Sequence, residues 1–339
     1  MVFSTVMSPS VIASSTYSQE KASAQGRVRE KMPYVARFAW ATLACNVAVV
    51  LWGAYVRATG SGAGCGDKWP ECGGAVLGAS AKTQTIIEFT HRATSGVALM
   101  MVGVLVVWAW RATTRRDWAR YSAILAAAFL VNEALLGAAL VLLGHVAQDR
   151  SSARILFLCL HFGNTLLLLA MLALTAWWLR SASSSQRLIR RPREVVAIGT
   201  GLAATMVIGI TGTVAALADT LFPTASLRSG LAQDFGSGVP ILLRLRLVHP
   251  IVAVTAAAYV LWVIFAIVRR QRRASGVAIA LLVLFLAQIS IGIVNVLLLA
   301  PIWLQILHLC VADLLWITLV IASADLLFMS ADTPLTAAA

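Results

Sequence analysis

The sequence predicts an all-α polytopic membrane protein, in which eight transmembrane helices form two four-helix bundles related by a pseudo-two-fold axis. Composition is the first observation: of 339 residues, 60% are hydrophobic and only 12% are charged, whereas a soluble domain is close to half apolar and a quarter charged. The second is a series of eight apolar segments, each long enough to cross a bilayer as a helix. The third is an internal repeat that relates the two halves of the chain.

The net charge of +13 is explained by the membrane. In a soluble protein, such an excess of basic residues would suggest a nucleic-acid partner. Here the Lys and Arg residues lie in short clusters between apolar runs, which is the pattern that membrane topology requires. The sequence therefore predicts the lipid bilayer and no nucleic acid as a partner. It excludes an ordinary soluble enzyme, a disordered chain and a disulfide-rich secreted module.

The elements follow in a regular order. A polar, Ser-rich arm has no apolar region ahead of a cleavage site, so we expect no cleaved secretory signal. The apolar segments lie at 34–56, 87–110, 119–144, 154–179, 194–218, 245–268, 276–299 and 302–328. The predicted units are the arm at 1–33, an N-terminal bundle at 34–180, a basic linker at 181–193, a C-terminal bundle at 194–328 and a tail at 329–339.

Basic clusters set the orientation. The arm, with Arg37 beside it, and the connections after the second, fourth and sixth segments hold 18 of the 27 Lys and Arg residues. Because basic loops stay on the cytoplasmic side, both termini are predicted to be cytoplasmic. The long loops at 57–86 and 219–244 are predicted to face outward.

The internal repeat is clearest in the third and seventh segments. The third contains EALLGAALVLL from Glu133, and the seventh contains QISIGIVNVLLL from Gln288, so that Gly137 aligns with Gly292. A histidine follows in the next segment of each half. Because each half has four segments, both keep the same orientation, and the predicted axis runs along the membrane normal. Polar residues near mid-membrane in these segments are expected to hydrogen-bond between helices: Asn132, Glu133, Gln288 and Asn295.

Four of the five histidines lie in the even-numbered segments, each a few residues inside the outer end. Ionisable groups in a membrane are costly and commonly functional, and two imidazoles facing each other across a bundle can hold a haem iron. We therefore predict two bis-His haem sites, made by His91 with His161 and by His249 with His308. Hydrogen bonding between helices is the alternative. Zinc is less favoured, because Cys or carboxylate ligands at metal-site spacing are missing. His145 is expected at the surface.

Glu88 lies three residues before His91 in EFTHR, so the two share a helix face. It can form an ion pair with Arg92 at i,i+4, or it can place a carboxylate beside the iron-binding face. There it could relay protons or stabilise a cationic intermediate. The second half has no matching acid. We favour the functional interpretation, in which Glu88 is catalytic and chemistry occurs in the first half, with electron storage in the second.

Two further groups lie at the outer side. Cys65 and Cys72 bracket GDKWPE in a Gly-rich loop, in a compartment that permits disulfides. A structural disulfide and a redox-active pair that passes electrons are both consistent with this spacing. Arginines near the outer helix ends can neutralise haem propionates or anchor the helices at the interface. They are Arg57, Arg92, Arg154, Arg244 and Arg246.

These segments match one family. VRATGSGAGCGDKWPEC, EFTHR, LHFGNT, HP and LQILHL occur in this order, and over roughly 34–328 the chain resembles the heme A synthase family, the CtaA-type cytochrome oxidase assembly proteins. The resemblance implies an oxidoreductase that converts the C8 methyl group of haem O to a formyl group, through the hydroxymethyl compound, to give haem A. It implies haem b at His249 and His308, haem O as substrate at His91 and His161, and a role for Glu88 in activity.

The resemblance also implies partners and a location. Heme O synthase and cytochrome oxidase assembly factors are expected partners, and a homo-oligomer is left open. The loop cysteines, Cys65 and Cys72, mark one bacterial class of the family and form a disulfide there, which implies a bacterial plasma membrane. Two features depart from the family pattern: Glu133 stands where Gln is expected, and the arm is long.

Three rival functions remain at this stage. The first is a b-type cytochrome that transfers electrons between quinol and an outer acceptor, which explains four histidines but not Glu88 in one half only. The second is a haem carrier, which would hold haem through weak, exchangeable contacts. The third is a transporter whose histidines are structural.

Overall fold

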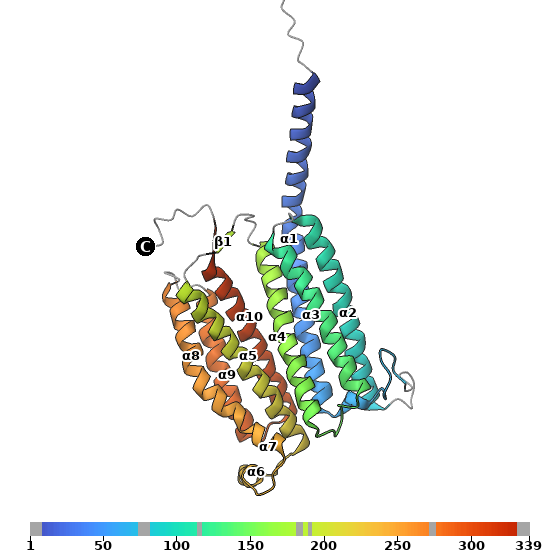
Figure 1. Ribbon diagram of the computed structural model, residues 1–339, viewed down its shortest axis with the longest axis vertical. Helices are drawn as coiled ribbons and strands as arrows, with labels where there is room; N and C mark the ends of the chain where they lie inside the picture. The colour runs from blue at the N-terminus through green and yellow to red at the C-terminus, as the bar shows by residue number, and fades with distance from the viewer. Residues whose placement is uncertain are drawn as a thin grey trace, which may run out of the picture.

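The computed structural model describes residues 9–73, 82–113, 117–180, 186–188, 192–270 and 276–330. Eight helices in these ranges are long and apolar enough to cross a membrane, which confirms the predicted all-α polytopic fold. Most of the predicted linker and nearly all of the predicted tail lie outside the described residues. The two halves form neighbouring groups of helices (Figure 1).

The first group contains four long helices. They are α1 (Pro9–Ala58), α2 (Thr83–Ala112), α3 (Trp118–Leu142) and α4 (Ser152–Arg180). The predicted arm is helical from residue 9, and this part of α1 projects beyond the other helices (Figure 1). The membrane span of α1 begins at Pro33, where the apolar sequence begins. A short 3-10 turn, η1 (Ser61–Ala63), follows α1.

The second group contains α5 (Pro192–Leu221), α8 (Val248–Arg270), α9 (Gly276–Leu297) and α10 (Ile302–Leu327). The sixth span was predicted at 245–268, and one candidate span is found there, at Ile241–Ala266. Within it, α7 (Ile241–Arg246) and α8 are separated at Leu247, an interruption that the sequence analysis did not predict. Pro250 explains the break, because its ring clashes with the carbonyl four residues earlier and its nitrogen has no hydrogen to donate. It is tolerated in the first turn of α8.

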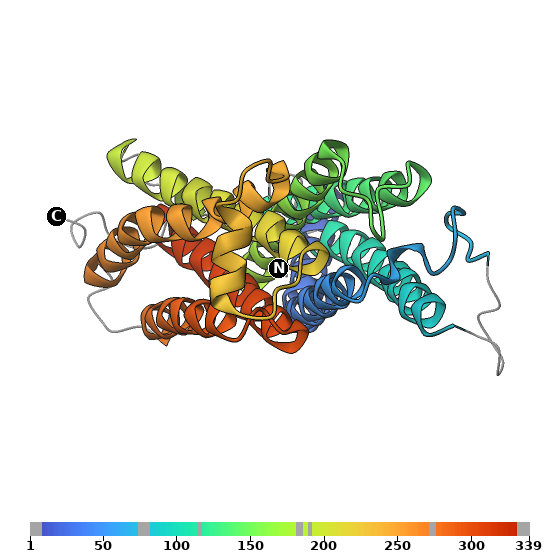
Figure 2. The ribbon, with the colours of Figure 1, turned by 90° about the horizontal axis from the view of Figure 1, so that it is seen from below.

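The two groups share a core along α4 and α10. Helix α4 packs against α5 and α10 as well as against α1 and α3, and one buried cluster joins α1–α4 to Trp316 and Val320 of α10. The indole of Trp316 donates to the Leu166 carbonyl at 2.8 Å. In the view from below, the groups lie side by side around this junction (Figure 2).

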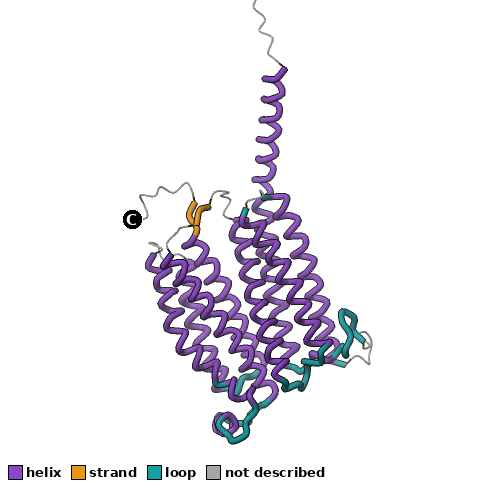
Figure 3. The backbone as a smooth tube through the Cα atoms, in the orientation of Figure 1, coloured by secondary structure: helices purple, strands orange, loops and turns teal. Residues whose placement is uncertain are grey.

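The two ends of the bundle differ. At one end, the extension of α1 emerges, and β1 (Gln186–Leu188) pairs antiparallel with β2 (Phe328–Ser330). At the other end lie the loop after α1 and the short helix α6 (Leu227–Asp234) (Figure 3). A capping box formed by Ser226 and Ser229 begins α6. The sequence analysis did not predict this helix. The helices therefore run between these two ends in alternating directions (Figure 3).

Candidate functional site

The structure brings the four membrane histidines together in two pairs. His91 on α2 and His161 on α4 lie close enough for a charge on one imidazole to act on the other. His249 on α8 and His308 on α10 are related in the same way. All four side chains are half-buried. Each half thus contains one pair, drawn from its own helices.

A glycine on a preceding helix faces each histidine ring. A Cβ atom added to the glycine would lie between 2.9 Å (Gly53) and 3.8 Å (Gly137) from Cε1 of the ring. The missing side chains leave room for the imidazoles beside the neighbouring helix. The facing pairs are Gly53–His91, Gly137–His161, Gly212–His249 and Gly292–His308.

Several ring nitrogens have no hydrogen-bond partner among the described residues. The buried Nδ1 atoms of His91 and His308 are of this kind. Nδ1 of His161 makes no hydrogen bond but lies 3.3 Å from a carboxyl oxygen of Glu133, and Nδ1 of His249 lies 3.2 Å from the hydroxyl of Thr211. A buried polar atom without a partner is costly in an apolar setting. Paired imidazoles cradled by glycines therefore fit a bis-His haem, which needs two axial ligands. Within the described ranges, no three His, Cys, Asp or Glu side chains form a metal cluster.

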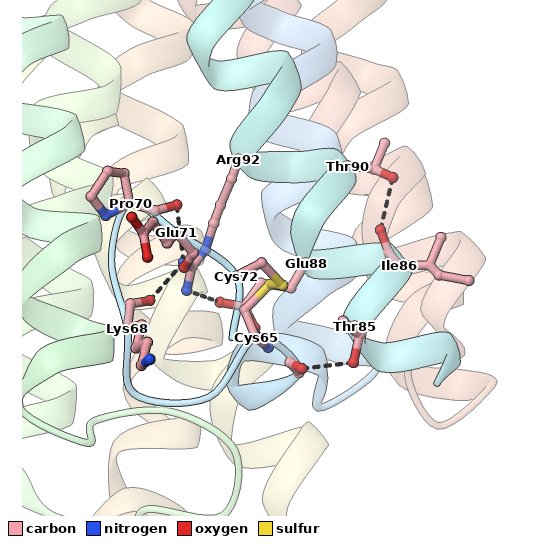
Figure 4. Close-up of a disulfide and its surroundings, with 11 residues drawn as sticks. Cys65, Lys68, Pro70, Glu71, Cys72, Thr85, Ile86, Glu88, Thr90 and Arg92 are labelled. Atoms are coloured by element: carbon pink, nitrogen blue, oxygen red, sulfur yellow. Dashed lines mark hydrogen bonds and ion pairs between the residues drawn. A yellow bond between two sulfur atoms is a disulfide. The ribbon is translucent and has the colours of Figure 1, made fainter. Parts of the chain in front are cut away.

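Glu88 is buried on α2, and both of its oxygens are engaged (Figure 4). Oε2 accepts a hydrogen bond from the Cys65 backbone N–H at 2.8 Å. Oε1 pairs with Nη2 of Arg92 at 2.6 Å, one helical turn later. The ion pair that the sequence allowed is therefore present. A catalytic role for Glu88 remains a prediction.

The same two residues anchor the outer loop to α2. Cys65 and Cys72 form the disulfide that the resemblance implied, with Cα atoms 4.5 Å apart. Nη1 of Arg92 donates to the carbonyls of Lys68 at 2.7 Å and Glu71 at 2.5 Å, inside the loop that the disulfide closes (Figure 4). The loop is thus held at a fixed place above the outer end of α2. A redox role for the disulfide remains a prediction.

Arg57 connects the two halves. Its Nη1 donates to the Ala216 carbonyl at 2.7 Å and to the Thr220 hydroxyl at 2.8 Å, both on α5. Its Nη2 donates to Oε1 of Gln305 on α10 at 3.1 Å. These contacts hold α1 against the second half near the outer end.

The other arginines also differ in their surroundings. Arg246 pairs with Asp219 at 3.3 Å and with Asp234 of α6, which holds α6 over the bundle. Arg154 donates to backbone carbonyls of the α3–α4 loop, and Arg244 is exposed. Arg57, Arg92 and Arg246 already bind protein groups. The predicted contact between the outer arginines and haem propionates therefore remains a prediction.

Glu133 was expected to hydrogen-bond between helices, and it does. Its Oε2 accepts from Asn164 at 2.5 Å and its Oε1 accepts from Thr165, both on α4. The sequence did not predict that Oε1 also lies 3.3 Å from Nδ1 of His161. The repeat contained the signal, because it aligns Glu133 with Gln288 just ahead of the second histidine of each half.

Asp313 on α10 is a further buried acid, and unlike Glu133 it was not singled out from the sequence. Its side chain is fully buried, and neither carboxyl oxygen has a hydrogen-bond partner in the described part of the chain. The signal was a single acid within the apolar run LCVADLLW. An ionised group there would be costly.

Together these features define a polytopic membrane protein with two related halves, each with a glycine-cradled histidine pair suited to a haem. Residues 36–320 match the cytochrome oxidase assembly protein family, and the chain belongs to that family.

Individual relatives carry two different names. Protoheme IX farnesyltransferase of Thermus thermophilus is 43% identical over 295 residues, which are 86% of this chain but 48% of the relative. Heme A synthase of Geobacillus kaustophilus is 40% identical over 130 residues, 38% of each chain. Heme A synthase of Halalkalibacterium halodurans is 41% identical over 128 residues, 38% of this chain and 40% of the relative. The chain thus spans about half the length of the Thermus relative.

Proposed function

We propose that this protein is a heme A synthase, which oxidises the C8 methyl group of haem O to a formyl group through the hydroxymethyl compound. The histidine pairs carry the proposal, because each half brings two imidazoles together against glycines, and two imidazoles can hold a haem iron. Membership of a cytochrome oxidase assembly family and the heme A synthases among its relatives support it.

The name protoheme IX farnesyltransferase describes an activity that we assign to a partner of this chain and not to the chain itself. The match covers 48% of the Thermus protein, so the transferase activity in its name can belong to the other half. Haem O carries a farnesyl group, and a protein that farnesylates protoheme makes the kind of substrate that this chain would use. Heme O synthase and cytochrome oxidase assembly factors are therefore the proposed partners.

The two pairs have different roles in this proposal. His249 and His308 hold a resident haem b, and His91 and His161 hold the substrate haem. The haem groups supply the redox chemistry, and the protein binds and orients them. Glu88 presents a carboxylate on the helix face of His91, where the Cys65 N–H and Arg92 keep it in place. From there it can accept or relay a proton.

The proposed location is a bacterial plasma membrane with both termini in the cytoplasm. The last turns of α2 and α4, which carry Arg111 and Arg180 of the basic clusters, lie at the end of the bundle where α1 projects (Figure 1). The disulfide lies at the opposite end, which would face the oxidising compartment, where such bonds persist.

A haem extraction tests the function. The full chain is expressed in a host that makes haem O but no haem A, and membrane haems are separated by chromatography with mass detection. We expect haem A or its hydroxymethyl precursor, and His91→Ala is the matched negative control. Unchanged haem O beside a purified protein that is red with haem b would instead favour an electron-transfer cytochrome.

A further inference from the structure

The polar side chain that faces the second histidine differs between the halves. On α3, Oε1 of Glu133 lies 3.3 Å from Nδ1 of His161. On α9, at the matching position of the repeat, Nε2 of Gln288 lies 3.2 Å from Nε2 of His308. His161 therefore faces a carboxyl group through Nδ1, whereas His308 faces an uncharged amide of similar size through Nε2.

Hydrogen-bond donors clamp the carboxyl group of Glu133. Asn164 donates to its Oε2 and Thr165 to its Oε1. The amide of Asn164 is itself held, because its Nδ2 also donates to the Phe129 carbonyl and its Oδ1 accepts from Asn132, both at 2.8 Å. These neighbours offer donors to an acceptor-only carboxylate, and they orient it toward the histidine.

The second half does not have this clamp. In the first half, the donors Asn164 and Thr165 lie three and four residues after His161. The residues three and four positions after His308 are Val311 and Ala312. The residue before the amide is Ala287, where the first half has an asparagine. None of these three side chains can donate a hydrogen bond. The network is therefore built in one half only.

A carboxylate behind a ligand histidine changes that ligand. It fixes the orientation of the ring and raises its basicity, and loss of such a partner typically changes metal affinity or activity by about 10–100-fold. The negative charge also stabilises ferric iron relative to ferrous iron, since the ferric state carries one more positive charge. An amide lacks this charge.

We propose that Glu133 is a positioning residue, which orients His161 and makes its imidazole a more basic ligand for a haem iron than that of His308. This inference rests on the proposed function, because it takes both histidine pairs as haem ligands. The haem at His91 and His161 then has the lower midpoint potential of the two and is the more readily oxidised.

A spectroelectrochemical titration tests this, with full-length protein from a host that makes haem O but no haem A. Glu133→Gln removes the charge and keeps the size. We expect one haem to shift about tenfold toward the ferrous form, which is about 59 mV for one electron, while the other haem is unchanged. Gln288→Glu is the matched variant and should lower the potential of the other haem. Each substitution lies in one half, so the wave that moves identifies that half.

The outcomes separate the two proposals. An unchanged potential in Glu133→Gln, at wild-type haem content, would overturn this inference and leave the proposed function intact. Absence of haem from the first half of the wild-type protein would overturn both. If Glu133→Gln fails to fold, Glu133→Met, which also removes the charge at similar size, decides, and an unchanged potential there overturns the inference. A purely structural role predicts lost haem without a shifted potential in the haem that remains.

Discussion

The two halves of the bundle share a histidine pair but differ in what surrounds it. Both set a glycine against each ring. The first half adds acids, with Glu88 under the disulfide loop and Glu133 beside His161. The second half has Gln288 at the latter position. A repeated scaffold can thus present the same kind of site twice, while a few polar side chains decide how each site behaves.

Removing a histidine of the second half should have the largest effect. His249→Ala or His308→Ala should abolish stable binding of haem b there, because the iron loses an axial ligand, while the first half keeps its haem. Haem content per chain and the visible spectrum measure this. His145→Ala, in the outer α3–α4 loop, is the control and should keep the full content. Wild-type haem content per chain in both histidine variants would contradict the assignment of the halves.

Glu88→Ala tests whether chemistry is confined to the first half. We expect both haems to remain bound and haem O oxidation to slow by about 10²–10⁴-fold, the usual contribution of a positioned acid or base. Product haems are quantified by chromatography. Arg92→Ala keeps the carboxylate but removes its ion pair and the loop contacts, so it should be less impaired. Equal losses in the two variants would reduce Glu88 to an anchor of the loop.

Gly53→Ala and Gly137→Ala compare the two cradles within one site. A Cβ at residue 53 would lie 2.9 Å from the His91 ring, whereas at residue 137 it would lie 3.8 Å from the His161 ring, an ordinary contact. Overpacking costs about 1–3 kcal/mol. Haem titration should show weaker binding in Gly53→Ala by this amount and little change in Gly137→Ala. Equal affinities would show that the His91 ring moves aside at no cost.

Asp313→Leu makes α10 resemble α4, which has Leu166 at the matching position five residues after its histidine. Because an unpaired buried polar group costs about 1–3 kcal/mol, we expect the free energy of unfolding in detergent to rise by about that amount. Asp325→Leu on the same helix is the control and should lower it, since Asp325 accepts from the Trp177 indole at 2.7 Å. A destabilised Asp313→Leu would mean that the carboxyl group has a native partner.

The smallest expected effect is a pH dependence of the α3–α4 loop. Burial acts to raise the pKa of Asp149, but hydrogen bonds from Ser151 and His145 outweigh it and lower that pKa. A lowered pKa stabilises the fold above the unfolded value, near 3.8, and this contribution is lost as the pH falls through the folded value. Solvent screening keeps it small.

Thermal unfolding from pH 7 to about pH 2 measures this contribution, with Asp149→Asn as the comparison. The difference in melting temperature between the wild type and the variant should shrink as the pH falls. A difference that stays constant over this range would contradict the assignment.

The positions of the spans and of the histidines follow from the sequence for one physical reason. In lipid, a segment must satisfy its backbone hydrogen bonds internally, so an apolar run of sufficient length becomes a helix wherever it occurs. The segment predicted at 276–299 is α9, Gly276–Leu297. The break before α8 could also have been predicted from the sequence, because Pro250 disfavours a continuous helix through the residues before it.

The sequence by itself determined which groups lie at which depth, with four histidines toward one end of the spans and the loop cysteines beyond them. Only the tertiary structure decided which groups meet. Glu88 receives the N–H of Cys65, 23 residues away, and Glu133 reaches His161 on the next helix. Such contacts depend on the rotation of each helix about its axis and on its crossing angles. Many packed side chains together set these rotations and crossing angles. The spacing of apolar residues along the sequence does not specify them.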